Sequence, residues 1–255
     1  MDFGIRGRVA LVTGASSGIG EAVALALAAE GVKLAVGARR RDRLEKVATE
    51  AKALGAADAR AFEVDLRDSG SIQRLLADVK DAFGSVDILV ANSGGPKPGT
   101  FLDKTLDDWD EGYRVVLRGM LELVGAVIPG MKAAGWGRIV ALTSTSVKQP
   151  IGTLVLSNAF RTALVSALKT LSLEVGRHGI TVNSIATGRV LTDRLVQIYG
   201  DEASIHASGQ ADIPLGRVAT PAEFAPMTAF LCSAPAGYVT GQTIAVDGGL
   251  IAGLL

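Results

Sequence analysis

A glycine-rich turn near the beginning of the sequence has the residue types that bind phosphate. Positions 13–20 read TGASSGIG, follow the apolar run 9–12 and precede the apolar stretch 22–29, so the glycines lie where a predicted strand becomes a predicted helix. Free backbone N–H groups at a helix N-terminus point at a bound anion, and glycine lets the backbone approach it closely. The turn therefore predicts a cradle for the diphosphate of a dinucleotide, with a purely structural turn as the alternative. Its residues are Gly14, Ser16, Ser17, Gly18, Ile19 and Gly20.

Arginines stand at the end of the second predicted strand, where the ribose of the adenosine should lie. Positions 34–40 read LAVGARR and come about 20 residues after the glycine turn. An acidic residue here would hydrogen-bond the ribose 2′-hydroxyl, whereas Arg39 and Arg40 would attract a 2′-phosphate. The sequence therefore predicts NADP(H) as the cofactor in preference to NAD(H). The alternative interpretation is a solvated helix start, because Arg41 and Arg43 continue the basic cluster.

The order of apolar runs predicts the elements that position this turn. Short β-rich runs alternate with longer amphipathic stretches, which is typical of a three-layer, doubly wound (Rossmann) α/β fold with a parallel sheet. Seven strands are expected, at residues 9–13, 33–36, 60–64, 88–91, 139–143, 181–185 and 243–246. Helices are expected at residues 21–30, 41–54, 69–83, 106–131, 158–177 and 222–232. Residues 191–214 are expected to lie over the carboxyl edge of the sheet, as a substrate lid or as a plain surface excursion.

The overall composition limits the classes of function. With 26 basic and 26 acidic side chains the net charge is +0, which argues against nucleic-acid binding, and the length favours one compact domain at residues 1–255. Apolar runs of about eight residues are too short to span a bilayer, and the first residues lack a signal-peptide pattern, so we expect a cytoplasmic protein with no membrane partner. The single cysteine, Cys232, excludes an internal disulfide, and His178 and His206 lie far apart in the sequence, so we expect no metal site.

Motifs along the whole chain resemble those of the short-chain dehydrogenase/reductase family. Besides the turn at 13–20 they are 65–66 (DL), 92–94 (NSG), 137–140 (GRIV), 187–193 (TGRVLTD) and 238–249 (YVTGQTIAVDGG). Ala91 stands where the family's Asn-Asn-Ala-Gly strand end has its first asparagine, and Thr187 replaces the proline of its Pro-Gly segment. The resemblance implies a homotetramer in which the last strand pairs subunits. It also implies cofactor binding by Asp65, Leu66, Asn92, Ser93, Gly94, Arg161, Gly188, Val190 and Thr192.

The resemblance also implies a reaction, the interconversion of a carbonyl and a secondary alcohol, which are the expected small-molecule substrates. The family uses a serine, a tyrosine, a lysine and an asparagine. Ser144 aligns with the serine, but Ser157 stands in place of the tyrosine. Arg161 replaces the lysine and Val116 the asparagine, and no Tyr-x-x-x-Lys pair occurs anywhere in the sequence. Losing the tyrosine removes general acid–base assistance worth about 10²- to 10⁴-fold, which slows such a reaction without forbidding it.

The residues that remain still suit carbonyl reduction. Ser144 and Arg161 could place a hydroxyl and a fixed cation beside the negative charge that builds on the carbonyl oxygen. Arg161 could also bind the ribose hydroxyls of the cofactor, as the family's lysine does. An NADP(H)-dependent oxidoreductase with an unusual proton path is therefore expected. The alternative is a catalytically impaired dinucleotide-binding protein that acts as a sensor or subunit.

The source of the proton stays open in the sequence. Water and Ser157 are candidates, and so are Lys148, Tyr113 and Tyr199, which lie outside the family's usual set. For Ser157 and Arg161 there is also a plain interpretation, in which the serine is a helix N-cap and the arginine an exposed helical cation.

Overall fold

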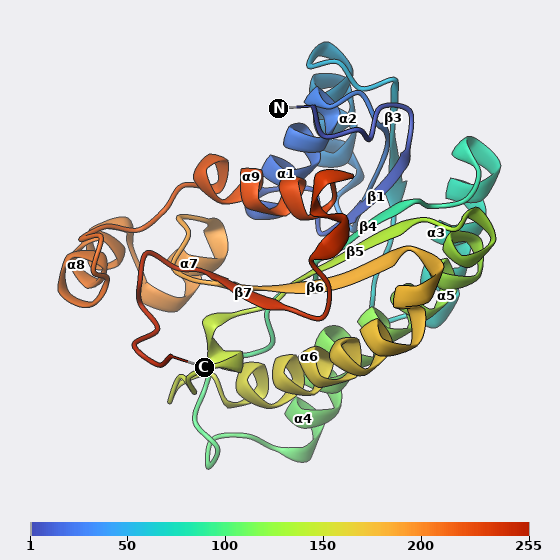
Figure 1. The fold of residues 1–255 in the computed structure, drawn as a ribbon. Coiled ribbons are helices and arrows are strands. Elements are labelled where there is room, and N and C mark those ends of the chain that lie inside the picture. Colours follow the sequence, from blue (N-terminus) through green and yellow to red (C-terminus); the bar gives the residue numbers. More distant parts are fainter. Residues whose placement is uncertain (1, 255) are drawn as a thin grey trace.

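Parallel strands form the centre of the molecule (Figure 1). The structure is a computed structural model and describes residues 2–254. Within these residues one seven-stranded sheet has the order β3-β2-β1-β4-β5-β6-β7, with every neighbouring pair parallel. Its strands are β1 (Val9–Thr13), β2 (Lys33–Ala38), β3 (Asp58–Glu63), β4 (Ile88–Ala91), β5 (Gly137–Leu142), β6 (Ile180–Thr187) and β7 (Thr243–Val246). The doubly wound α/β prediction is confirmed.

All the predicted strands form, but several of them extend beyond their predicted ends. β5 begins two positions before the predicted start because Arg138 is part of the strand and is 4% exposed. Its Nε donates to the carbonyl oxygen of Ser233 at 2.9 Å, and its Nη1 donates to that of Gly137 at 2.8 Å. Apolar patterning does not identify such a residue as a strand residue, because its burial depends on hydrogen bonds to distant backbone groups.

Helices cover both faces of the sheet, as parallel strands require (Figure 1). The apolar side of α1 packs on one face through Leu27, together with Phe224 of α9, and Leu123 of α5 and Leu164 of α6 pack on the other. The first layer consists of α1 (Gly18–Ala29), α2 (Arg41–Ala53) and α9 (Pro221–Leu231), and the second of α3 (Ser69–Phe83), α5 (Gly119–Ala134) and α6 (Val155–Val175). Short 3-10 turns are η2 (Thr145–Val147), η3 (Gly176–His178) and η4 (Pro235–Tyr238). Among residues 2–254, no helix combines the length and the apolar character that crossing a membrane would need.

The long helix predicted at 106–131 is interrupted. The structure has α4 (Leu106–Gly112), then a π-helical segment η1 (Tyr113–Arg118), and then α5. Val116 lies in the π-helical segment and is fully buried. A Cβ added at Gly119 would lie 2.1 Å from the carbonyl oxygen of Leu66, so two backbones meet where α5 begins. The apolar periodicity of this stretch gives no sign of that contact, and the single predicted helix was wrong in this respect.

The segment at residues 191–214 contains two helices. α7 (Asp193–Tyr199) begins after Thr192, whose Oγ1 accepts a hydrogen bond from the N–H of Leu195 at 3.4 Å, and α8 (Glu202–Asp212) follows. α7 lies at the carboxyl edge of the sheet, next to the ends of the central strands (Figure 1). Ile205 of α8 belongs to a small apolar cluster separate from the two cores of the sheet. Of these two helices, α7 contributes residues to the lining of the cleft at this edge.

Candidate active site

A cleft of about 1010 Å³ opens at the carboxyl ends of the strands, which is where open α/β sheets bind their ligands. The loops after β1, β2, β4, β5 and β6 all contribute to it. The residues that the sequence predicted for cofactor binding, together with Ser144, Ser157 and Arg161, all line this cleft, from Gly14 in the glycine turn to Thr192 ahead of α7. The fold thus gathers motifs that are far apart in the sequence at one edge of the sheet.

The glycine turn closes so tightly that its glycines cannot be replaced. A Cβ at Gly20 would lie 2.2 Å from the carbonyl oxygen of Gly14, and Gly14 itself has a φ of 61°. α1 begins at Gly18, and its N-cap residue Ser17 makes no side-chain hydrogen bond to the helix. Ser17 therefore does not cap the first N–H groups of α1, and the positive end of the helix dipole there favours an anion.

Arg40, more than Arg39, forms the basic contact with this turn. Its Nη2 donates to Ser17 Oγ at 2.7 Å and to Ser16 Oγ at 3.0 Å, and its Nε donates to Ser16 Oγ at 3.2 Å. Arg39 and Arg40 both line the cleft and both are exposed, but the contacts with the turn come from Arg40. The interpretation as a solvated helix start holds for the next arginine, since Arg41 pairs with an acidic neighbour one turn along α2. The basic cluster therefore contains both a site arginine and solvated ones.

Asp65, a predicted cofactor-binding residue, is held by a neighbouring arginine. Its carboxylate accepts hydrogen bonds from Nε of Arg67 at 2.9 and 3.0 Å, and Arg67 also reaches Glu111 at 3.4 Å. The guanidinium beside it lowers the pKa of the Asp65 carboxyl, with a smaller contribution from the charge of Arg39. Asp65 is therefore an ionised acceptor at the edge of the cleft at neutral pH.

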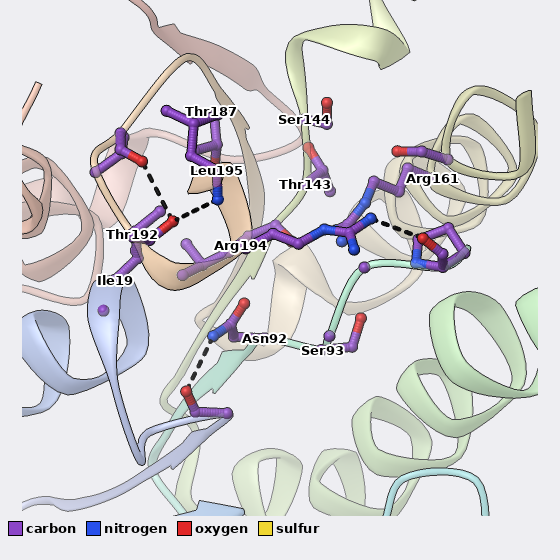
Figure 2. A pocket seen from close by; sticks show the side chains of 18 of the residues that line it. Ile19, Asn92, Ser93, Thr143, Ser144, Arg161, Thr187, Thr192, Arg194 and Leu195 are labelled. Atoms are coloured by element: carbon purple, nitrogen blue, oxygen red, sulfur yellow. Dashed lines mark hydrogen bonds between the residues drawn. The ribbon is translucent and has the colours of Figure 1, made fainter. Parts of the chain in front are cut away.

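Two buried hydroxyls in the cleft have no hydrogen-bond partner among the described residues. They are Ser93 Oγ, after β4, and Thr187 Oγ1, at the end of β6. Between them and the glycine turn, Asn92 Nδ2 donates to the carbonyl oxygen of Gly14 at 3.4 Å (Figure 2). Unpaired buried polar groups are unfavourable, and a polar ligand could satisfy them. Together with the glycine cradle they fit a dinucleotide, whose amide and hydroxyl groups could bind here.

The two candidate catalytic serines have different surroundings. Ser144 lines the cleft, and its Oγ accepts a hydrogen bond from the N–H of Ser146 at 3.1 Å. Ser157 is buried, and its Oγ lies 3.2 Å from Ser146 Oγ. Ser157 is the third residue of α6, whose N-cap position is occupied by Leu154, so the interpretation of Ser157 as a helix N-cap was wrong.

Arg161 is a desolvated cation in the cleft. It is 7% exposed and lines the cleft, so the interpretation as an exposed helical cation was also wrong. Its Nη1 donates to the carbonyl oxygen of Leu142, at the end of β5, at 3.0 Å. Burial, and then the nearby charge of Arg194, lower the pKa of Arg161 to about 10, so it remains protonated at neutral pH. The position therefore keeps a positive charge where the family has a lysine.

The structure reduces the number of candidate proton donors that lie in the cleft. Of the three extra candidates, Tyr199 lines the cleft, whereas Tyr113 and Lys148 do not belong to its lining. Tyr113 is partly exposed, and the centre of its ring lies 6.2 Å from that of Phe160.

Sequence reasoning missed one residue of the cleft. This residue is Arg194, which reaches into the cleft from α7 (Figure 2). The available sign was a cation in the first turn of a short helix, where the dipole disfavours it.

Known proteins are similar to this chain over nearly its whole length. A family model described as enoyl-(acyl carrier protein) reductase matches residues 14–251. A 2,3-dihydro-2,3-dihydroxybenzoate dehydrogenase of Bacillus subtilis is 32% identical over 98% of this chain and 98% of its own length. A 3-oxoacyl-[acyl-carrier-protein] reductase, FabG, of Staphylococcus epidermidis is 35% identical over 94% of this chain and 98% of its own.

A solved structure shows the same fold along the full length of both chains. The L-sorbose reductase of Gluconobacter frateurii, in complex with NADPH and L-sorbose, gives a TM-score of 0.94 at 32% identity and covers 100% of each chain. Sequence, fold and cleft therefore lead to one conclusion: the chain belongs to the short-chain dehydrogenase/reductase family of oxidoreductases.

Proposed function

We propose that the protein interconverts a carbonyl and a secondary alcohol with NADP(H), by a proton path that lacks the family's usual tyrosine. The observation that carries the proposal is Arg161, a buried cation that shares one cleft with Ser144 and the glycine turn. Negative charge builds on the carbonyl oxygen during reduction, and a cation held away from water stabilises that charge more strongly than an exposed one.

The surroundings of Arg40 support NADP(H) in preference to NAD(H). Arg40 donates three hydrogen bonds to the Oγ atoms of Ser16 and Ser17. The same N–H groups could donate to the oxygens of a 2′-phosphate. The residues of the glycine turn would hold the diphosphate, and Ser93 and Thr187 offer free buried hydroxyls for the nicotinamide end. The NADPH complex of the L-sorbose reductase agrees with this preference. When bound, the cofactor gives or accepts the hydride.

The chain's own residues stabilise charge and move the proton. Because Ser144 Oγ already accepts from a backbone N–H, its hydroxyl proton is free to donate to the carbonyl oxygen. Arg161 uses one N–H on the carbonyl of Leu142, which leaves others for the ribose hydroxyls and the developing oxyanion. The hydroxyl pair of Ser146 and Ser157 can pass a proton from water, and Tyr199 is the second donor that the cleft offers.

One observation favours the alternative of an impaired, cofactor-binding sensor or subunit. The Ser157 hydroxyl is buried against Ser146 Oγ, and an aliphatic hydroxyl is a far weaker acid than a phenol. Such a protein would bind NADPH tightly and turn over no carbonyl. The two functions therefore differ in turnover and not in cofactor affinity.

A substrate panel with purified protein separates the two functions. Sugars, keto esters, acyl thioesters and steroids are assayed for NADPH oxidation or NADP⁺ reduction, with NADPH affinity measured in parallel. We expect clear turnover with at least one class, and a loss of that turnover in the Ser144→Ala variant. Tight NADPH binding without turnover by any class would support the sensor instead.

We further propose that the protein is a homotetramer and that α7 closes over bound substrate. Large apolar side chains are exposed on α4, on α6 and before β7, namely Leu106, Leu173 and Tyr238, and subunit contacts could cover them. Light scattering coupled to gel filtration tests the assembly, with the monomer mass as the contrary result. Amide exchange of residues 193–199, with and without NADP⁺ and substrate, tests the closure of α7.

A further inference from the structure

A second arginine crosses the cleft from α7. Arg194 is the second residue of that helix, and its Nη2 donates to the carbonyl oxygen of Pro96 at 2.7 Å. A Cβ built on Gly95 would lie 2.5 Å from Nε of Arg194, so the guanidinium rests directly against the loop after β4. A cation in the first turn opposes the helix dipole, so its placement does not stabilise α7. Local folding therefore does not account for this arginine.

Arg194 and Arg161 face each other. Figure 2 shows the two guanidinium groups pointing toward one another, Arg194 from α7 and Arg161 from α6. The charge of Arg194 contributes to the lowered pKa of Arg161, and burial lowers the pKa of Arg194 as well. Arginine side chains do not lose their proton in proteins, so two like charges lie side by side in a poorly solvated place.

Neither cation has an anionic partner in the part of the chain that the structure describes. Within residues 2–254 no aspartate or glutamate forms an ion pair with either, and each guanidinium donates one hydrogen bond to a backbone carbonyl. A guanidinium has five N–H donors, so most donors of the pair are free. Burying charge without a counter-ion is unfavourable, and a neighbour of like charge adds to the cost. A bound anion would offset both effects.

The phosphates of the dinucleotide have donors elsewhere in the cleft. These donors are the glycine turn and Arg40, which hydrogen-bonds Ser17 within that turn. Thr192 lies against the same turn, because a Cβ built on Gly18 would lie 3.0 Å from Thr192 Cγ2. The Arg161–Arg194 pair lies instead at the ends of β4 and β5. Arg161 holds the carbonyl of Leu142, which is two positions before Ser144, so the pair adjoins the group that would bind the reacting carbonyl.

We propose that Arg161 and Arg194 form a subsite for the carboxylate of an oxo-acid substrate. This inference rests on the proposed carbonyl chemistry of the same cleft and adds the substrate class. A carboxylate accepts two parallel N–H bonds from a guanidinium, and two facing guanidinium groups can hold both of its oxygens. Its negative charge would also compensate the pair of cations and attach α7 to the loops after β4 and β5. A neutral ketone of the same size would lack this contact.

The test measures the binding of oxamate, a non-reducible analogue of a short 2-oxo acid. Binding is measured by calorimetry, with and without NADP⁺. Wild type is compared with Arg194→Gln and with Arg194→Lys, which keeps the charge. The matched control is Arg43→Gln, which removes an exposed cation that lies 3.8 Å from Asp193, next to Arg194 but outside the lining of the cleft. NADP⁺ affinity is measured for each variant.

The expected result is a selective loss of anion affinity. Removing a charge-assisted hydrogen bond weakens oxamate binding by roughly 10- to 150-fold in Arg194→Gln, with partial recovery in Arg194→Lys and no change in Arg43→Gln. NADP⁺ affinity stays within about threefold in all variants, well below the tenfold step that 1.4 kcal/mol represents. If substrate turnover is found, the same variant raises KM for an oxo acid and leaves that of its methyl ester unchanged.

Three results with the variants and with phosphate would overturn the proposal, and so would a wild type that fails to bind oxamate. Wild type and Arg194→Gln could bind oxamate equally, Arg194→Gln could lose NADP⁺ by the same factor as oxamate, or inorganic phosphate could bind more tightly than oxamate and compete with NADP⁺. The last two would make Arg194 a cofactor ligand. Wild type that binds NADP⁺ but not oxamate refutes this inference alone, whereas wild type that binds oxamate but not NADP⁺ refutes the proposed function alone.

Discussion

Replacing Arg40 with glutamine should change the choice of cofactor. Arg40 donates three hydrogen bonds to the hydroxyls of Ser16 and Ser17, at 2.7, 3.0 and 3.2 Å. In the NADP(H) complex these donors would turn to the 2′-phosphate, and hydrogen bonds to a charged group contribute about 1.5–3 kcal/mol. The Arg40→Gln variant should therefore bind NADPH roughly 10- to 150-fold more weakly. NADH has no 2′-phosphate, so its affinity should stay nearly the same.

The assay is a fluorescence titration of both reduced cofactors at one fixed salt concentration, because phosphate contacts weaken as salt rises. Arg41→Gln is the matched control, since Arg41 is an exposed arginine that pairs with Glu45 on α2. Arg39→Gln shows whether the neighbouring arginine contributes. The reasoning is refuted if Arg40→Gln weakens NADH and NADPH by the same factor, which would indicate a distorted glycine turn, or if Arg39→Gln alone abolishes the preference.

Further changes test the oxyanion donor, the glycine turn and the core. Ser144→Ala should lower kcat by about 10²- to 10³-fold with NADPH affinity retained, whereas a variant that only loses NADPH would assign Ser144 to cofactor binding. Gly20→Ala should abolish NADPH binding because its Cβ would lie 2.2 Å from a backbone oxygen, and Gly152→Ala, with open space around it, should bind normally. Burial raises the pKa of the Cys232 thiol from 9.0 to about 12. The contribution of the protonated thiol to the free energy of unfolding is therefore complete below pH 9.0 and is lost as the pH rises toward 12. Urea unfolding at pH 8 and 10 should show a loss of about 1.4 kcal/mol that Cys232→Ala lacks, and an equal loss in both proteins would contradict this reasoning.

Much of the cofactor site could be predicted because local sequence encodes it. A glycine turn between an apolar strand and an apolar helix needs only neighbouring residues, and the basic residues after β2 follow from the same alternation of strands and helices. Parallel strands place their carboxyl ends at one edge, so the later motifs reach the same cleft. The outcome for Arg40 and Arg39 shows the limit, because the sequence identifies the cluster but not the side chain that contacts the glycine turn.

The parts that could not be predicted depend on contacts between distant segments. The break at residues 113–118 precedes the point where the backbone of Gly119 meets that of Leu66, and Arg194 enters the cleft because α7 folds back over the loop after β4. Neither contact leaves a periodic pattern. The burial of Arg161 was also open, since an arginine one turn into a helix is usually solvated and here instead binds the carbonyl of Leu142.

Deuteride transfer tests the central claim most directly. Purified protein is incubated with the carbonyl panel, oxo acids included, and with NADPH that carries deuterium at the transferred position. The masses of the products are then determined by mass spectrometry. The account predicts a secondary alcohol that contains one deuterium, formed by wild type and strongly reduced in the Arg161→Met variant. A wild-type protein that binds NADPH tightly but yields no deuterated alcohol from any class would contradict it.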